Sequence, residues 1–160
     1  MARRHGVLGR FLLAILIIIM LIAITGAIFE VFIAPDASKV ESKYSDNDKV
    51  TAIVTSGSIM GVKPARGLAR VALALYGYSN DSLTENIDTV ITISYTETKD
   101  GKDTTYEAMV IYFDSISDAN TARKGIKDKI KDNDKVTMFR GKSLVLGDEK
   151  AVMRYYYVIF

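Results

Sequence analysis

Few residues of this 160-residue chain have side chains that could act as nucleophiles or bind soft metals. There is no cysteine, and the single histidine, His5, lies beside arginines near the N-terminus. The charges near the N-terminus predict that this end stays in the cytoplasm. The rest of the chain then has no histidine or cysteine, which excludes a Ser–His–Asp or Cys–His nucleophile and Cys- and His-based metal sites there. Serine and lysine remain, because a lysine of lowered pKa can remove the proton of a serine hydroxyl.

The stretch TSGSIMG at 55–61 is the one candidate in the sequence for this serine–lysine chemistry. It resembles the Ser-Gly-Ser-Met stretch of type I signal peptidases, and the resemblance implies that Ser58 is the nucleophile of a membrane-tethered Ser/Lys hydrolase. Ile59 displaces the methionine by one position, and the following proline and the Arg-Val-x-Gly segment of that family are missing. The corresponding segment 86 residues further along the chain, GKSLVLG at 141–147, has a similar pattern of residues but not this chemistry. This favours Ser58 as a turn or strand residue.

Motifs for phosphate and metal binding are incomplete. FRGKSLVLG at 139–147 contains Gly-Lys-Ser, but Val136 stands where a phosphate-binding loop requires its first glycine. We interpret Arg140-Gly141-Lys142 as a hairpin turn. The oxygen-rich triplets at 46–48 and 132–134 lack the glycine and the distal glutamate of a calcium loop, which favours solvated turns. We therefore expect no cofactor and no metal.

Residues 11–29, FLLAILIIIMLIAITGAIF, are apolar and carry no charge. At ~1.5 Å per residue a helix of this length spans about 28 Å, close to the hydrocarbon thickness of a bilayer. Arginines precede the stretch and Glu30 is the first acidic residue after it, which predicts a cytoplasmic N-terminus and an exported C-terminus. We predict a cytoplasmic tip at 1–10, a transmembrane anchor at 11–33 and an extracytoplasmic domain at 34–160. The orientation residues are Arg3, Arg4 and Arg10, and the anchor residues are Phe11, Leu12, Leu13, Ile15, Leu16, Ile17, Ile18, Ile19, Met20, Leu21, Ile22 and Ile24.

Three alternatives to this anchor stay open: a signal peptide cleaved near Thr25-Gly26-Ala27, a pilin-type leader, and a buried helix of a soluble fold. The net charge of +2 comes from the N-terminal tip. Three of the 21 basic residues precede residue 11 and one of the 19 acidic residues is Glu30, so 18 of each sign remain from residue 34 onward. We therefore expect the lipid bilayer, and not nucleic acid, as the partner of the basic tip.

The segment after residue 89 has the clearest pattern of the exported part. Two β-rich runs, at 90–98 and 103–114, flank Asp100-Gly101 and predict a hairpin with a type I′ turn. The second run is apolar on both faces at 108–113, which predicts a central strand. A helix follows, with Ser117 as its N-cap. Its apolar stripe consists of Ala119, Ala122, Ile126 and Ile130. The fold class is therefore α+β, a small antiparallel sheet covered by helices.

The hexapeptide DNDKVT occurs at 46–51 and again at 132–137, and apolar positions on both sides match at the same offset. We interpret 36–78 and 118–160 as two pseudo-repeats, with convergent loop chemistry as the alternative. The match predicts a helix that begins near Pro64 and a C-terminal helix capped by Asp148. The apolar side of the first helix carries Leu68, Val71, Ala72 and Leu75, and that of the second carries Val152, Tyr155, Tyr156 and Ile159. Residues 156–160 stay open between helix and strand.

Three consecutive tyrosines, Tyr155, Tyr156 and Tyr157, suit either a protein interface or the core of the domain. We expect a membrane-anchored, extracytoplasmic and non-enzymatic binding domain of the cell envelope that contacts another protein. The competing function is the Ser/Lys hydrolase with Ser58. A spacer or assembly unit is the third, although the apolar helix has only Gly26 as a small interior glycine for close packing.

Overall fold

The computed structural model describes residues 12–21 and 33–158. Residues 12–21 are helical, and a domain of five strands and five helices follows. Its elements, in chain order, are α2 (Ala37–Tyr44), β1 (Val50–Ser56), α3 (Pro64–Leu75), α4 (Asp81–Thr84), β2 (Thr89–Lys99), β3 (Lys102–Tyr112), α5 (Ile116–Lys131), β4 (Val136–Arg140), β5 (Ser143–Gly147) and α6 (Glu149–Tyr156). The α+β class is confirmed.

The five strands form one antiparallel sheet in the order β1-β2-β3-β5-β4. The long hairpin of β2 and β3 supplies its centre, and Asp100 and Gly101 at the turn both have positive φ, as a type I′ turn requires. The predicted hairpin and the central position of its second strand are confirmed. Gly141 and Lys142 connect β4 to β5, which confirms the second predicted turn.

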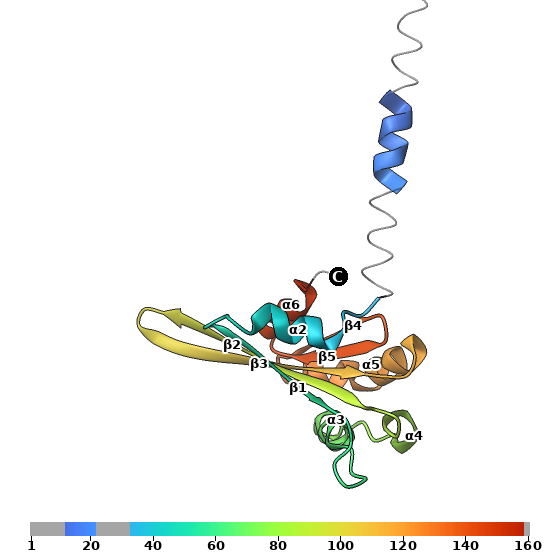
Figure 1. Ribbon diagram of the computed structural model, residues 1–160, viewed down its shortest axis with the longest axis vertical. Helices are drawn as coiled ribbons and strands as arrows, with labels where there is room; N and C mark the ends of the chain where they lie inside the picture. The colour runs from blue at the N-terminus through green and yellow to red at the C-terminus, as the bar shows by residue number, and fades with distance from the viewer. Residues whose placement is uncertain (1–11, 22–32, 159–160) are drawn as a thin grey trace, which may run out of the picture.

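Helices cover both faces of the sheet (Figure 1). In Figure 1, α2 and α6 lie above the sheet and α3 and α4 lie below it, and the core that α3 lines also includes α5. We call these faces the α2–α6 side and the α3–α5 side. Strand residues alternate between the two, so that Ile91 and Val110 face α2 and α6, whereas Val90 and Ile111 face α3 and α5. Each side therefore has its own hydrophobic core.

Helix α5 begins two residues earlier than its sequence indicated. Ser115, and not Ser117, is the N-cap, and its hydroxyl accepts a hydrogen bond from the Asp118 amide at 3.1 Å. The four residues of the predicted stripe are all buried. Gly125 has a packing role that the sequence did not indicate, because a Cβ at this position would lie 2.1 Å from the Tyr78 ring.

The predicted anchor is described only in part. Residues 12–21 form a helix whose large apolar side chains are exposed. Within 12–21 and 33–158, none of the helices combines the length and the apolar character that a bilayer crossing requires. Residue 11, residues 22–32 and the orientation residues of the 1–10 tip lie outside the described residues.

The two segments of the predicted repeat have related but unequal elements. The first contains α2, β1 and α3, and the second contains the end of α5, then β4, β5 and α6. The short hairpin at 59–62 stands where the second segment has the full strand β5. The loops differ too, because Asp134 has a positive φ of 54° whereas Asp48, its counterpart in the first segment, does not have a positive φ. The repeat stays an interpretation of the sequence.

Candidate functional site

Ser58 lies in the connection between β1 and α3. Ile59 and Val62 exchange two backbone hydrogen bonds of 2.9 Å, which closes a tight turn with Met60 and Gly61 at positive φ. The Ser58 side chain is exposed, and within the described part of the chain it has no hydrogen bond to a lysine. The next lysine along the chain, Lys63, forms an ion pair of 2.6 Å with Asp88. The structure therefore does not bring together a serine and a desolvated lysine here.

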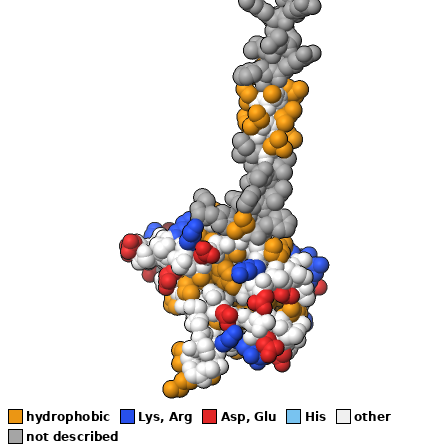
Figure 2. Space-filling model, turned by 45° about the vertical axis from the view of Figure 1, so that its right-hand side comes forward, with side chains coloured by type: hydrophobic (Ala, Val, Ile, Leu, Met, Phe, Trp, Pro, Cys, Tyr) orange, Lys and Arg blue, Asp and Glu red, His pale blue; other side chains and the backbone are white. Residues whose placement is uncertain are grey.

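This turn carries apolar side chains into solvent. Ile59 is 68 % exposed, Val62 is 65 % exposed and Met60 is 100 % exposed. We call Ile59, Met60, Gly61 and Val62 the 59–62 tip. It projects from the α3–α5 side below α3 in Figure 1, and Figure 2 shows hydrophobic side chains at the end of that projection. Exposed apolar residues grouped in this way are typical of a surface that contacts another molecule.

Helix α3 begins with Pro64 as predicted, but it is rotated about its axis relative to our expectation. Of the predicted apolar stripe only Ala72 is buried, and the other three residues are exposed, so the predicted buried face of this helix is wrong. The buried residues are Ala65, Ala69, Ala72 and Leu73. Alanines let the helix approach the sheet closely, and the larger Leu68, Val71 and Leu75 then remain outside. The missed signal is the series of alanines at 65, 69 and 72, which also has helical spacing.

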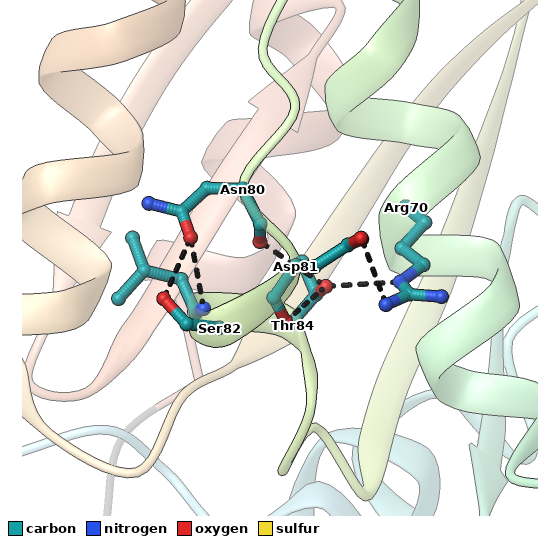
Figure 3. Close-up of polar contacts among 6 residues, drawn as sticks. Arg70, Asn80, Asp81, Ser82 and Thr84 are labelled. Carbon is teal, nitrogen blue, oxygen red and sulfur yellow. Dashed lines mark hydrogen bonds and ion pairs between the residues drawn. The ribbon is translucent and has the colours of Figure 1, made fainter.

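An ion pair and several hydrogen bonds hold α3 against α4 (Figure 3). The Arg70 guanidinium lies 2.8 Å from the Asp81 carboxylate, and its Nε donates to the Thr84 hydroxyl at 3.1 Å. Asn80 caps α4, because its side-chain oxygen accepts from the Leu83 amide and from the Ser82 hydroxyl. These contacts connect α4 to α3 in the rotation that buries Ala65, Ala69 and Ala72.

A basic groove of about 400 Å³ lies beside the 59–62 tip. Lys63, Arg66 and Arg70 line it together with tip residues. Lys63 and Arg70 are paired with carboxylates, whereas Arg66 has no ion pair within residues 33–158. The tip is therefore flanked by positive charge, which favours contact with a molecule whose own surface combines apolar and acidic groups.

A second concave region lies between α3 and the end of β5, with a volume of about 210 Å³. Its floor includes Met109 and Leu146, and Lys135 and Asp148 form an ion pair of 2.6 Å at its rim. Burial raises the pKa of Asp148, but hydrogen bonds from the Glu107 amide and from Lys135 outweigh it and bring this pKa below its usual value. Drug-sized ligands need about 300 Å³ or more, so this cavity is a weaker candidate than the exposed surface.

The three consecutive tyrosines occupy different environments. Tyr155 is completely buried, and its hydroxyl lies 2.8 Å from that of Ser143 and 3.3 Å from that of Tyr112. Tyr156 is half-buried and donates to the Phe139 carbonyl, and burial raises the pKa of Tyr156 to about 12. Tyr157 alone of the three exposes half of its surface. Helix α6 ends at Tyr156, so the first of the residues 156–160, which we left open between helix and strand, is helical. Residues 159–160 lie outside the described part.

Comparisons with known proteins add no relative to this description. No protein-family model, curated protein or solved structure matches the chain.

Proposed function

We propose that the chain is a single-pass membrane protein whose domain at 34–160 lies outside the cytoplasm and binds another protein of the cell envelope. The apolar segment at 11–33 is the anchor and the arginine-rich tip at 1–10 stays inside. The contact is made by the 59–62 tip and the groove beside it. The domain acts by binding and not by catalysis.

The observation that supports this function is the exposure of the 59–62 tip. Met60 is completely exposed, and it adopts a φ of 51°, which a side chain other than glycine rarely takes. Neither the exposed side chain nor this backbone conformation stabilises the isolated domain. Contact with an apolar pocket in a partner would remove this surface from water, at roughly 25 cal/mol per Å². The cation of Arg66 beside the tip favours acidic residues around that pocket.

The repeat belongs to the same proposal. We interpret 36–78 and 118–160 as copies of one ancestral helix–strand–helix unit, in which the second copy retained a full strand after its turn. The first copy has only the Ile59–Val62 bridge there. This short bridge leaves the 59–62 tip projecting from the domain, because no partner strand of the sheet covers it.

The location predicts the result of a protease experiment on sealed cells that express the full-length chain. Protease added outside is expected to digest the domain at 34–160, whereas a cytoplasmic protein measured in the same cells stays intact. Digestion of the domain only after lysis would contradict the proposed orientation.

The contact predicts a site-specific photo-crosslink. A photoreactive amino acid at Met60 of the full-length chain in intact cells is expected to form one discrete protein adduct. The matched control is Lys102, which follows the other exposed type I′ turn of the domain and is expected to give no adduct. Met60 is completely exposed, so its replacement leaves the fold intact. Equal labelling from both positions, or adducts with lipid alone, would contradict a protein contact at the tip.

A further inference from the structure

Strand β1 forms one edge of the sheet, so one side of its backbone faces away from the other strands. The Thr96 amide donates to the Lys49 carbonyl, and β1 continues from there in antiparallel register with β2. Because the hydrogen-bonding direction alternates along a strand, the amides and carbonyls of Val50, Ala52 and Val54 point away from β2. The Asn47 side chain accepts from the Val50 amide at 2.9 Å. Within the described residues, Ala52 and Val54 have no such partner on their outer side.

The usual protections of an edge strand are missing from β1. Its sequence, VTAIVTS, contains no charge and no proline, and its central residue, Ile53, is 59 % exposed on the α3–α5 side. The opposite edge, β4, is shorter, and the Arg123 guanidinium lies 5.4 Å from the ring of its Phe139. A long edge strand of this composition is a template for pairing with another strand.

We propose that β1 pairs with β1 of a second copy of this chain, in antiparallel register about a two-fold axis at Ile53. In this register Ala52 lies opposite Val54 of the second copy, and the two residues exchange backbone hydrogen bonds on both sides of the axis. Ile53 meets the same residue of the second copy as a non-hydrogen-bonded pair, with Cα atoms about 4.5 Å apart. Each five-stranded sheet continues into the sheet of the other copy.

The side chains beside β1 suit an identical partner. A two-fold axis perpendicular to the sheet keeps both α3 helices on the same side, where the exposed Leu68, Val71 and Leu75 approach their counterparts. The exposed residues of α3 are uncharged, and its two arginines, Arg66 and Arg70, are half-buried, with Arg70 paired to Asp81. An unrelated partner would need no such self-complementarity.

The same axis agrees with the way in which the chain enters the domain. The carbonyl of Pro35 accepts a hydrogen bond from Tyr112 on the α2–α6 side of the sheet. Because the axis preserves the two sides, Pro35 of both copies lies on one side of the combined sheet. Two copies can therefore be held in a single membrane, and confinement to that membrane raises their effective concentration.

Cysteine substitution tests the register directly, since the chain has no cysteine of its own. The full-length Ile53→Cys variant, oxidised in native membranes with copper phenanthroline, is expected to form a disulfide-linked dimer. The matched control is Thr51→Cys, on the same side of the same strand, whose two copies would lie about 13 Å apart along the strands. The Thr51→Cys variant is expected to remain a monomer. No dimer with Ile53→Cys, or equal dimer with both variants, would overturn the proposal.

A charge at the axis provides a second measurement. Ile53→Lys places two ammonium groups against each other, and the exposed position tolerates lysine without loss of the fold. The full-length wild type in detergent is expected to have the mass of a dimer, and Ile53→Lys that of a monomer. A dimer that persists in Ile53→Lys would overturn the proposal. Met60→Asp is expected to abolish binding at the 59–62 tip and leave the dimer unchanged, so the failure of either proposal is seen separately.

Discussion

Replacing Gly147 with alanine is expected to destabilise the domain by about 3–5 kcal/mol, from backbone strain and overpacking together. Gly147 has a φ of 140°, and a Cβ there would lie 2.3 Å from the Glu107 carbonyl oxygen and 2.6 Å from the Ala108 Cα. Both are backbone atoms of β3, paired with β5. They can move only if the two strands separate. The midpoint of urea unfolding of the full-length protein in detergent measures this loss.

The control for this prediction is Gly101→Ala at the turn of the β2–β3 hairpin. Gly101 has a positive φ of 75°, but no atom lies within 4 Å of a Cβ placed there. Gly101→Ala therefore carries the conformational cost alone, about 1–2 kcal/mol. Equal losses in the two variants would show that the close contact between β3 and β5 contributes nothing.

Removing the Tyr155 ring is expected to cost about 4 kcal/mol, the usual effect of truncating a buried aromatic residue to alanine. The ring is completely buried between α6 and the sheet. Its hydroxyl lies 2.8 Å from that of Ser143, whose own hydroxyl donates to the Arg140 carbonyl at 2.6 Å. Tyr155→Ala leaves a cavity in the α2–α6 core. Thermal unfolding of the full-length protein is expected to shift down by more than 10 °C.

Two variants separate the contributions to this effect. Tyr155→Phe keeps the ring and removes the hydroxyl, so a loss of about 1 kcal/mol is expected. Tyr157→Ala, two residues away and half exposed, is expected to change the free energy of unfolding by less than about 1 kcal/mol. A small effect of Tyr155→Ala would contradict the central place of this residue in the core.

Patterns in the sequence predicted those elements whose signal is local. Asp100-Gly101 indicates one turn type, and the spacing of Ala119, Ala122, Ile126 and Ile130 matches one face of a helix. The central strand was predictable because both of its faces are apolar. In these cases the residues that decide the structure lie within one element.

The rotation of α3 could not be predicted in this way. Its sequence has two apolar stripes, one of alanines and one of larger residues, and hydrophobicity favours the larger one. The structure buries the alanines against the sheet, and Arg70 of the same helix contacts Asp81 and Thr84 of α4. Such information resides in distant residues. The sequence patterns did not indicate the exposed Leu68, Val71 and Leu75 beside β1, nor the 59–62 tip, because their exposure also depends on residues distant in the sequence.

The attachment of Pro35 determines how the domain carries mechanical load. Its carbonyl accepts from the Tyr112 hydroxyl at 2.7 Å, at the end of the central strand β3. The next element, α2, is attached by the buried Val40 and Tyr44 and by a hydrogen bond of 2.6 Å from the Tyr44 hydroxyl to the Arg154 carbonyl. The Lys43 ammonium, also on α2, donates to the Tyr157 carbonyl. Tension applied at residue 33 therefore acts on α2 and on these three side-chain hydrogen bonds, each contributing about 1 kcal/mol, before it reaches the strands. Under a pulling force, α2 is therefore expected to detach before the strands of the sheet separate.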